Sequence, residues 1–202
     1  MPALAADEFP IAGFSSATPG QPPGAWKFST LPNKKATGFS VVELDGARVL
    51  KVEADDSYGN LSHAMRAQVS DKSMLVWKWR VAFDAGKLSL GERAKLALAH
   101  NSTGQDVPTE TLCYVWDNKL AEGTHLANAF TKRIRLLVLQ SGSAKLGQWQ
   151  SQRRNLSADY LRAFADETDG KVPEVVGVAV SADADNTHGK GLAYVGDVTL
   201  TP

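Results

Sequence analysis

The sequence predicts an all-β fold, a single-domain β-sandwich or jelly roll with one short helix. Short apolar runs rich in β-branched and aromatic residues recur along the chain, and turn residues such as Asp45-Gly46 separate them. Only one segment has helical spacing, and strands and helices do not alternate. A chain of 202 residues, 43% of them apolar, can bury a core without disulfides or metals.

The strands are expected where apolar residues alternate with polar ones or cluster between turns. The clearest is 75–83, where five large apolar side chains share one face. We expect two of them, Trp77 and Trp79, to fill the core, because large aromatic side chains dominate protein interiors. The other expected strands are 39–43, 47–53, 94–99, 112–116, 134–140, 175–182 and 194–200.

One helix is expected from Ser157 onward. Ser157 is a favourable N-cap residue, and Asp159 places an acid in the first turn, near the positive end of the helix dipole. Tyr160, Leu161 and Phe164 form one apolar stripe. The helix would therefore close the sandwich or cover a sheet edge.

The N-terminal part is rich in glycine and proline over residues 10–38, which indicates an extended segment that wraps over the body. Ala3-x-Ala5 is typical of the small residues that precede signal-peptidase cleavage. We therefore expect residues 1–9 to be a signal-peptide remnant or disordered, and 10–202 to form the single domain. The protein is expected to be exported, that is periplasmic or secreted.

Composition argues against several classes of function. Basic and acidic residues balance at 22 each, so nucleic acid is not an expected partner. No apolar run approaches the roughly 20 residues of a transmembrane helix. Cys113 is the single cysteine and is expected in the core rather than as a nucleophile. The four histidines are too scattered for a zinc site.

Six short motifs follow one another through most of the chain: Trp77-Lys-Trp79-Arg80-Val81, Tyr114-Val-Trp116, Ser141-Gly142 with Gly147-Gln-Trp149, Arg154-Asn155 with Asp159-Tyr160, Asp183-Ala-Asp185-Asn186-Thr187 and Tyr194-Val-Gly-Asp197. In this order they resemble an uncharacterised family of exported bacterial proteins, a domain of unknown function. The resemblance covers about residues 40–200. It implies one β-sandwich domain and no established activity.

Two tryptophans are candidates for ligand contact, because flat aromatic faces stack on sugar rings. Trp116 is followed by the turn residues Asp117-Asn118, so we expect Trp116 and Asp117 at a rim of the sandwich. Trp149 lies in a loop-like segment and is a second candidate. The alternative for both tryptophans is burial in the core.

A polar cluster follows the strand expected at 175–182. Asp183, Asp185, Asn186 and His188 would lie at the rim, with the two acids on one face. Three interpretations stay open: a turn closed by side-chain to backbone bonds, a cation site, or a ligand or catalytic site. The full EF-hand pattern is absent.

The last expected strand contains Asp197 and resembles the closing strand of jelly-roll carbohydrate-binding modules. The resemblance implies a structural calcium shared with an acid from an early strand; Glu43 is the expected partner, and Asp7 or Glu8 are alternatives. No other cofactor is expected. Arg133 and Arg135 share a strand face and would bind a carboxylate through paired hydrogen bonds, or else form a solvated surface.

Three functions are consistent with these patterns. The first is a non-catalytic binding module of the cell envelope with a glycan as its ligand. The second is a hydrolase or lyase that acts on a polysaccharide, and the third is a structural or protein-interaction domain without a small ligand. The first is our prediction, although it depends on analogy at the level of the fold.

Overall fold

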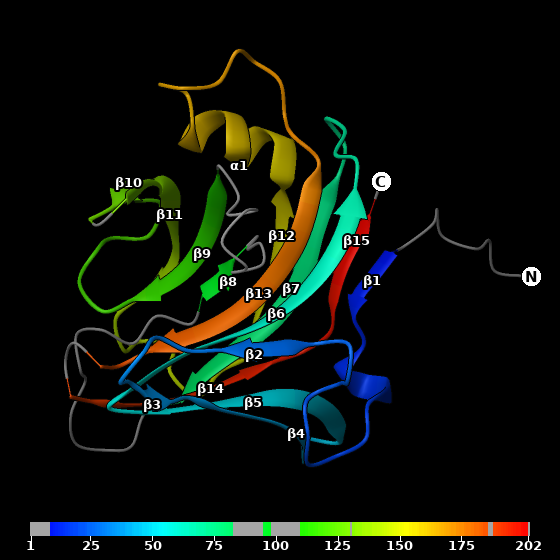
Figure 1. Cartoon of the computed structure of the whole chain (residues 1–202), viewed down its shortest axis with the longest axis vertical. Coiled ribbons are helices and arrows are strands. Elements are labelled where there is room, and N and C mark those ends of the chain that lie inside the picture. Colours follow the sequence, from blue (N-terminus) through cyan, green and yellow to red (C-terminus); the bar gives the residue numbers. More distant parts are fainter. Residues whose placement is uncertain (1–8, 83–94, 98–109, 130, 186–187, 202) are drawn as a thin grey trace, which may run out of the picture.

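The computed structural model describes residues 9–82, 95–97, 110–129, 131–185 and 188–201. These residues form two curved sheets that enclose a common core, which confirms the predicted β-sandwich (Figure 1). No helix within these ranges is long and apolar enough to cross a membrane.

The seven-stranded sheet has the order β1-β15-β7-β14-β5-β4, with β12 paired to the other side of β7. Its strands are β1 (Phe9–Ala12), β4 (Gly38–Leu44), β5 (Ala47–Asp55), β7 (Met74–Ala82), β12 (Gln150–Asn155), β14 (Lys190–Val195) and β15 (Val198–Thr201).

The eight-stranded sheet has the order β10-β11-β9-β8-β13-β6-β2, with β3 also paired to β6. Its strands are β2 (Lys27–Ser29), β3 (Lys35–Ala36), β6 (Ser57–Ala67), β8 (Lys95–Ala97), β9 (Thr111–Asp117), β10 (His125–Asn128), β11 (Thr131–Ser141) and β13 (Val175–Asp183). A strand is found at each of the ranges expected from the sequence, although the range 194–200 is divided between β14 and β15. Only Lys95–Ala97 of the range 94–99 is described, and residue 83 of the range 75–83 lies outside the described residues.

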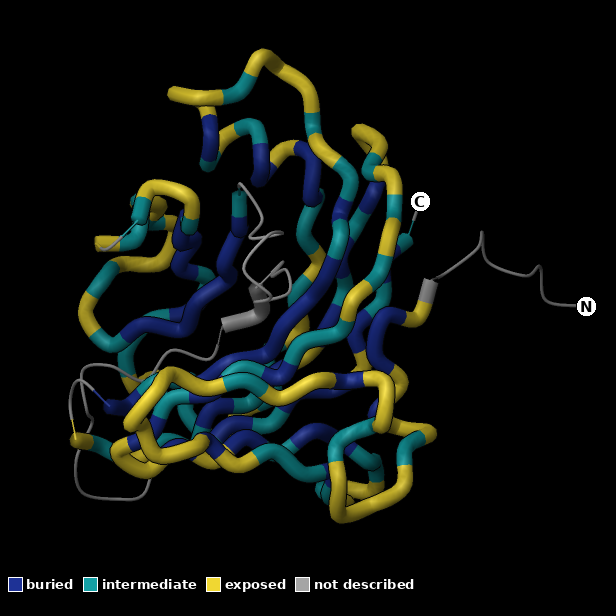
Figure 2. Tube along the Cα trace, viewed as in Figure 1, coloured by how far each residue is buried: buried dark blue, intermediate teal, exposed yellow. Residues whose placement is uncertain are grey.

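Four aromatic side chains lock the two sheets together. Trp77 and Trp79 of β7 are 2% and 1% exposed, as predicted. Trp77 packs on Tyr114 and Trp79 on Trp116, with ring centroids 5.1 and 6.1 Å apart. Buried residues run along the inner strands of both sheets in Figure 2. Cys113 is buried too, as expected.

The long strand β6 was not predicted, because two of its three buried positions carry small residues instead of large apolar ones. Ser57, Gly59 and Leu61 alternate as buried residues. A Cβ on Gly59 would lie 2.8 Å from the Thr37 Cβ and 3.0 Å from the Phe28 ring, so neighbouring side chains occupy that space. The periodicity of apolar residues cannot reveal a strand whose buried face is covered by side chains of other segments.

The short helix α1 (Leu156–Ala163) joins the ends of both sheets. It begins two residues earlier than predicted, because Asn155 rather than Ser157 is the N-cap and accepts a bond from the Ala158 N–H. Asp159 accepts hydrogen bonds from Tyr114 of β9 and from Arg154 of β12. The helix thus bridges the two sheets, which confirms its predicted closing role.

The N-terminal segment crosses from one sheet to the other. β1 pairs with β15 in the seven-stranded sheet, whereas β2 and β3 pair with β6 in the eight-stranded sheet. Between them, the 3-10 helix η1 (Phe14–Ser16) inserts Phe14 into the core, where its ring packs against Trp26 at 5.5 Å. Residues 9–36 therefore tie the two layers together.

Candidate functional site

A hollow forms where the central strand β7 changes partners. β14 pairs with Trp79–Ala82 of β7 and ends at Val195, and β15 pairs with Met74–Val76 of β7 and begins at Val198. The sequence predicted one strand over 194–200, but Gly196 and Asp197 interrupt it. The break opens a depression of about 280 Å³ on the outer face of the seven-stranded sheet.

Most of the strand residues in the walls of this hollow alternate with core residues along their strands. Val49 and Val76 are apolar members of this outer face, and Arg48, Lys78 and Asp197 contribute charge. Three hydroxyl side chains complete the polar part of the lining, from Ser15, Ser151 and Thr199. An apolar floor with polar groups around it is the usual composition of a small-molecule site.

The Lys78 side chain is held in a defined position beside Trp149. A Cβ on Gly196 would lie 2.8 Å from the Lys78 Cγ, so the lysine stem lies against this glycine. Its ammonium nitrogen is 4.9 Å from the centroid of the Trp149 ring, a cation–π contact. Within the described ranges, no carboxylate forms an ion pair with Lys78, so its donors can reach a ligand.

Trp149 is half-buried on the same outer face. Its indole N–H donates to the Asp45 carboxylate at 3.0 Å, and Arg80 pairs with the same carboxylate at 3.0 Å. Of the two tryptophans proposed from the sequence, this is the one with access to a ligand.

The two acids proposed as calcium ligands both lie near the hollow but already have partners. Asp197 accepts hydrogen bonds from the Ser15 backbone N–H, at 2.8 Å, and from the Ser15 hydroxyl. Glu43 pairs at 3.6 Å with Arg48, its cross-strand neighbour. In the part of the chain that the structure describes, no three acidic, histidine or cysteine side chains gather as metal ligands. Asp7 and Glu8 lie outside that part.

Trp116 and Asp117 do not form a ligand-binding rim. Trp116 is 1% exposed, its ring packs on Trp79, and its N–H donates to the Gly142 carbonyl, so the expected ligand contact is wrong. The Asp117 carboxylate accepts from the N–H groups of Lys119 and Leu120 and shapes the turn after β9. The turn residues were recognised correctly, but the ring before them faces inward.

Asp185 and His188, which follow β13, each pair with a charged side chain at another rim, away from the hollow's lining. Asp185 is buried and pairs with Lys34 at 2.7 Å, and this contact raises the pKa of Lys34. The imidazole Nδ1 of His188 lies 2.8 Å from Asp56. β13 ends at Asp183, so the predicted alternation does not reach Asp185. Asn186 lies outside the described residues.

The two arginines have different environments although they share a strand face. Arg133 is exposed, whereas Arg135 is buried and pairs with Asp166 at 3.0 Å and Glu167 at 2.7 Å. The guanidinium lowers the pKa of Asp166 and lies 5.1 Å from the Phe164 ring. Arg135 therefore anchors the chain after α1 and is not available to an acidic ligand, which corrects the prediction.

Sequence reasoning missed most of the hollow, including Lys78, Arg48 and Ser15. The available signal was the polar half of the Trp77-Lys-Trp79-Arg80 alternation, because the residues between core tryptophans must face outward. The approach of Ser15 and of β12 to this face depends on contacts distant in sequence.

These features define the class of protein: its fold is that of the β-sandwich carbohydrate-binding modules. The family 11 module of the cellulosomal cellulase Lic26A-Cel5E of Clostridium thermocellum has a TM-score of 0.52 at 10% identity, over 98% of this chain and 96% of that chain. A family 11 module from the same organism, in complex with a β-1,3-1,4-mixed-linked tetrasaccharide, has a TM-score of 0.49 at 11% identity and covers 98% and 97%. At such low identity, the match with a TM-score of 0.52 shows the fold alone.

The chain belongs to the family described as "Protein of unknown function (DUF3047)", whose model matches residues 24–84 and 81–199. This result agrees with the resemblance seen in the six motifs. The comparison with curated proteins found no match.

Proposed function

We propose that the protein is a glycan-binding module of the cell envelope and that the hollow beside Trp149 is its binding site. The observation that supports this most is the Lys78 side chain, which lines the hollow and carries its ammonium over the Trp149 ring, on a carbohydrate-binding-module fold. Export to the periplasm or the medium is part of the proposal and follows from Ala3-x-Ala5.

The lining suits a sugar because it offers both hydrogen-bond donors and acceptors beside apolar groups. Sugar hydroxyls would accept from Lys78 and donate to Asp197, which retains acceptor capacity beyond its two bonds to Ser15. The C–H face of a ring would lie on Val76, which is partly exposed. None of these roles requires a metal or a chemical step, so we propose binding without catalysis.

Titration of a panel of soluble glycans by calorimetry tests this function, with β-1,3-1,4-mixed-linked glucan as one probe. We expect Lys78→Met and Trp149→Ala to lower the affinity at least about fivefold. Lys78→Met removes a charge-assisted hydrogen bond to the ligand, and Trp149→Ala removes the cation–π contact that positions Lys78, each worth about 1 kcal/mol or more.

The matched controls are Lys72→Met and Phe28→Ala, an exposed lysine and an exposed aromatic residue outside the hollow. These two variants should bind as the wild type does. If no glycan binds, or if only the control variants lose affinity, the proposed function is wrong. Thermal unfolding with EDTA or added Ca²⁺ tests the predicted calcium ion, since a ligand of the native state raises Tm.

A further inference from the structure

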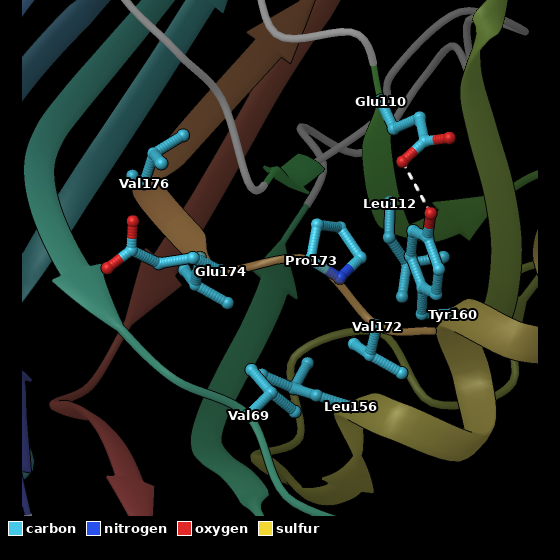
Figure 3. Close-up of a pocket in the computed structure, with 11 residues that line it drawn as sticks. Val69, Glu110, Leu112, Leu156, Tyr160, Val172, Pro173, Glu174 and Val176 are labelled. Atoms are coloured by element: carbon cyan, nitrogen blue, oxygen red, sulfur yellow. Dashed lines mark hydrogen bonds between the residues drawn. The ribbon is translucent and has the colours of Figure 1, made fainter. Parts of the chain in front are cut away.

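A second, apolar pocket lies between α1 and the beginning of β13, and it shares no lining residue with the hollow (Figure 3). Leu156 and Tyr160 of the helix form one wall, and Leu112 of β9 and Val175 of β13 form others. The rest of the lining comes from Val69, Glu110, residues 172–174, Val176 and Gly177. The pocket therefore has mostly aliphatic walls.

One carboxylate, that of Glu110, lies at the side of this pocket and accepts a hydrogen bond from the Tyr160 hydroxyl (Figure 3). Burial and the bond to Glu110 raise the pKa of Tyr160, so the phenol stays protonated and remains the donor at neutral pH. A carboxylate can accept several hydrogen bonds, and Tyr160 supplies only one of them. Glu110 thus keeps acceptor capacity for a ligand.

The other charges around the pocket are paired. Glu174 lies across the pocket from Glu110 in Figure 3 and pairs with Arg66 at 2.7 Å. Asp169, whose negative charge also raises the pKa of Tyr160, pairs with Lys171 at 3.2 Å. Glu110 forms no ion pair with any described residue, so among the described residues it is the carboxylate of this pocket without a basic partner.

The volume of the pocket, about 50 Å³, limits the size of an occupant. An apolar cavity of about 150 Å³ binds benzene, which has six carbons, so a space of one third that volume encloses about two methylene groups of an alkyl chain, and the rest of the chain lies at the open mouth. Each buried methylene would contribute about 0.8 kcal/mol. An occupant that matches both walls and charge combines a short aliphatic chain with a cationic end.

We propose that this pocket binds the alkylammonium end of a ligand, with the ammonium on the Glu110 carboxylate and the aliphatic chain between Val69, Leu156 and Val172. The ligand is a free primary amine or the lysine side chain of a peptide, which present the same chemistry. The site is independent of the proposed glycan function.

Ligand-detected NMR titration of the whole chain with n-butylamine, which is butylammonium at pH 7, tests the proposal. We expect wild-type protein to bind it and Glu110→Gln to lower the affinity at least tenfold, because the amide keeps the shape and loses the charge. Glu122→Gln removes an exposed carboxylate that pairs with Lys145 outside the pocket, and it should bind as the wild type does.

The neutral 1-butanol and the anionic butyrate separate charge recognition from apolar uptake. Equal binding of either one, unchanged binding by Glu110→Gln, or no binding of butylammonium would overturn the proposal. Thermal unfolding of each variant confirms that it is folded. Binding of N-acetyl-lysine methylamide as well would assign a peptide lysine, and binding of the free amine alone would assign a small amine.

Discussion

Gly59 is the residue that most limits the packing between β6 and the segments before it. Its α-carbon faces Thr37, Phe28 and Phe39 at distances that leave no room for a methyl group. Thr37 is itself buried and hydrogen-bonded to Ser57 at 3.0 Å, so it cannot easily move aside. The small residues that hid this strand from sequence analysis are the ones the packing requires.

We therefore expect Gly59→Ala to lower the free energy of unfolding by about 1–3 kcal/mol, the usual cost of an overpacked core. Urea denaturation measures this. Gly24→Ala is the control, since a Cβ there meets nothing within 4 Å and Gly24 has no left-handed φ. Equal stability of the two variants would contradict the packing argument.

At the scale of elements, α1 is held by one carboxylate that joins both sheets. Asp159 is buried, and its carboxylate accepts hydrogen bonds from Tyr114 of β9 at 2.9 Å and from Arg154 of β12 at 2.8 Å. Burial beside this carboxylate raises the pKa of Tyr114, and the ion pair raises that of Arg154. The helix thus closes one end of the sandwich through polar contacts as well as through Leu156, which belongs to the core.

We expect Asp159→Asn to destabilise the protein by about 2 kcal/mol, because it leaves the partly buried Arg154 without its counter-charge. The value is below that of a fully buried pair, since the Arg154 side chain is 31% exposed. Asp169→Asn, at an exposed acid that also pairs with a basic residue, should change stability by less than about 0.5 kcal/mol. Chemical denaturation that gives equal losses would show that Asp159 does not bridge the sheets.

At the scale of the whole molecule, the N-terminal segment fastens the two layers and borders the hollow. Ser15 connects this segment to Asp197 at the break between β14 and β15. The segment also pairs with strands of both sheets, so its docking and the shape of the candidate site depend on each other.

We expect Asp197→Ala to increase amide hydrogen exchange in β1 and η1 while the core strands stay protected, because local opening needs less free energy than global unfolding. Exchange followed by mass spectrometry of the N-terminal peptides measures this. Asp71→Ala, at an exposed acid in the turn before β7, serves as the control. Unchanged exchange over 9–16 in Asp197→Ala would mean that other contacts hold the segment.

The sequence by itself determined the fold class, the strands with strong apolar alternation, the helix and the family, because these depend on local periodicity and on short motifs. It also placed Trp77 and Trp79 in the core. Only the tertiary structure showed that Trp116 faces inward, that Arg135 forms ion pairs with Asp166 and Glu167, and that β6 is a strand. The position and lining of the hollow also depend on the tertiary structure. Ser15, Lys78 and Asp197 come together only through pairings between strands distant in sequence, which no local pattern reveals.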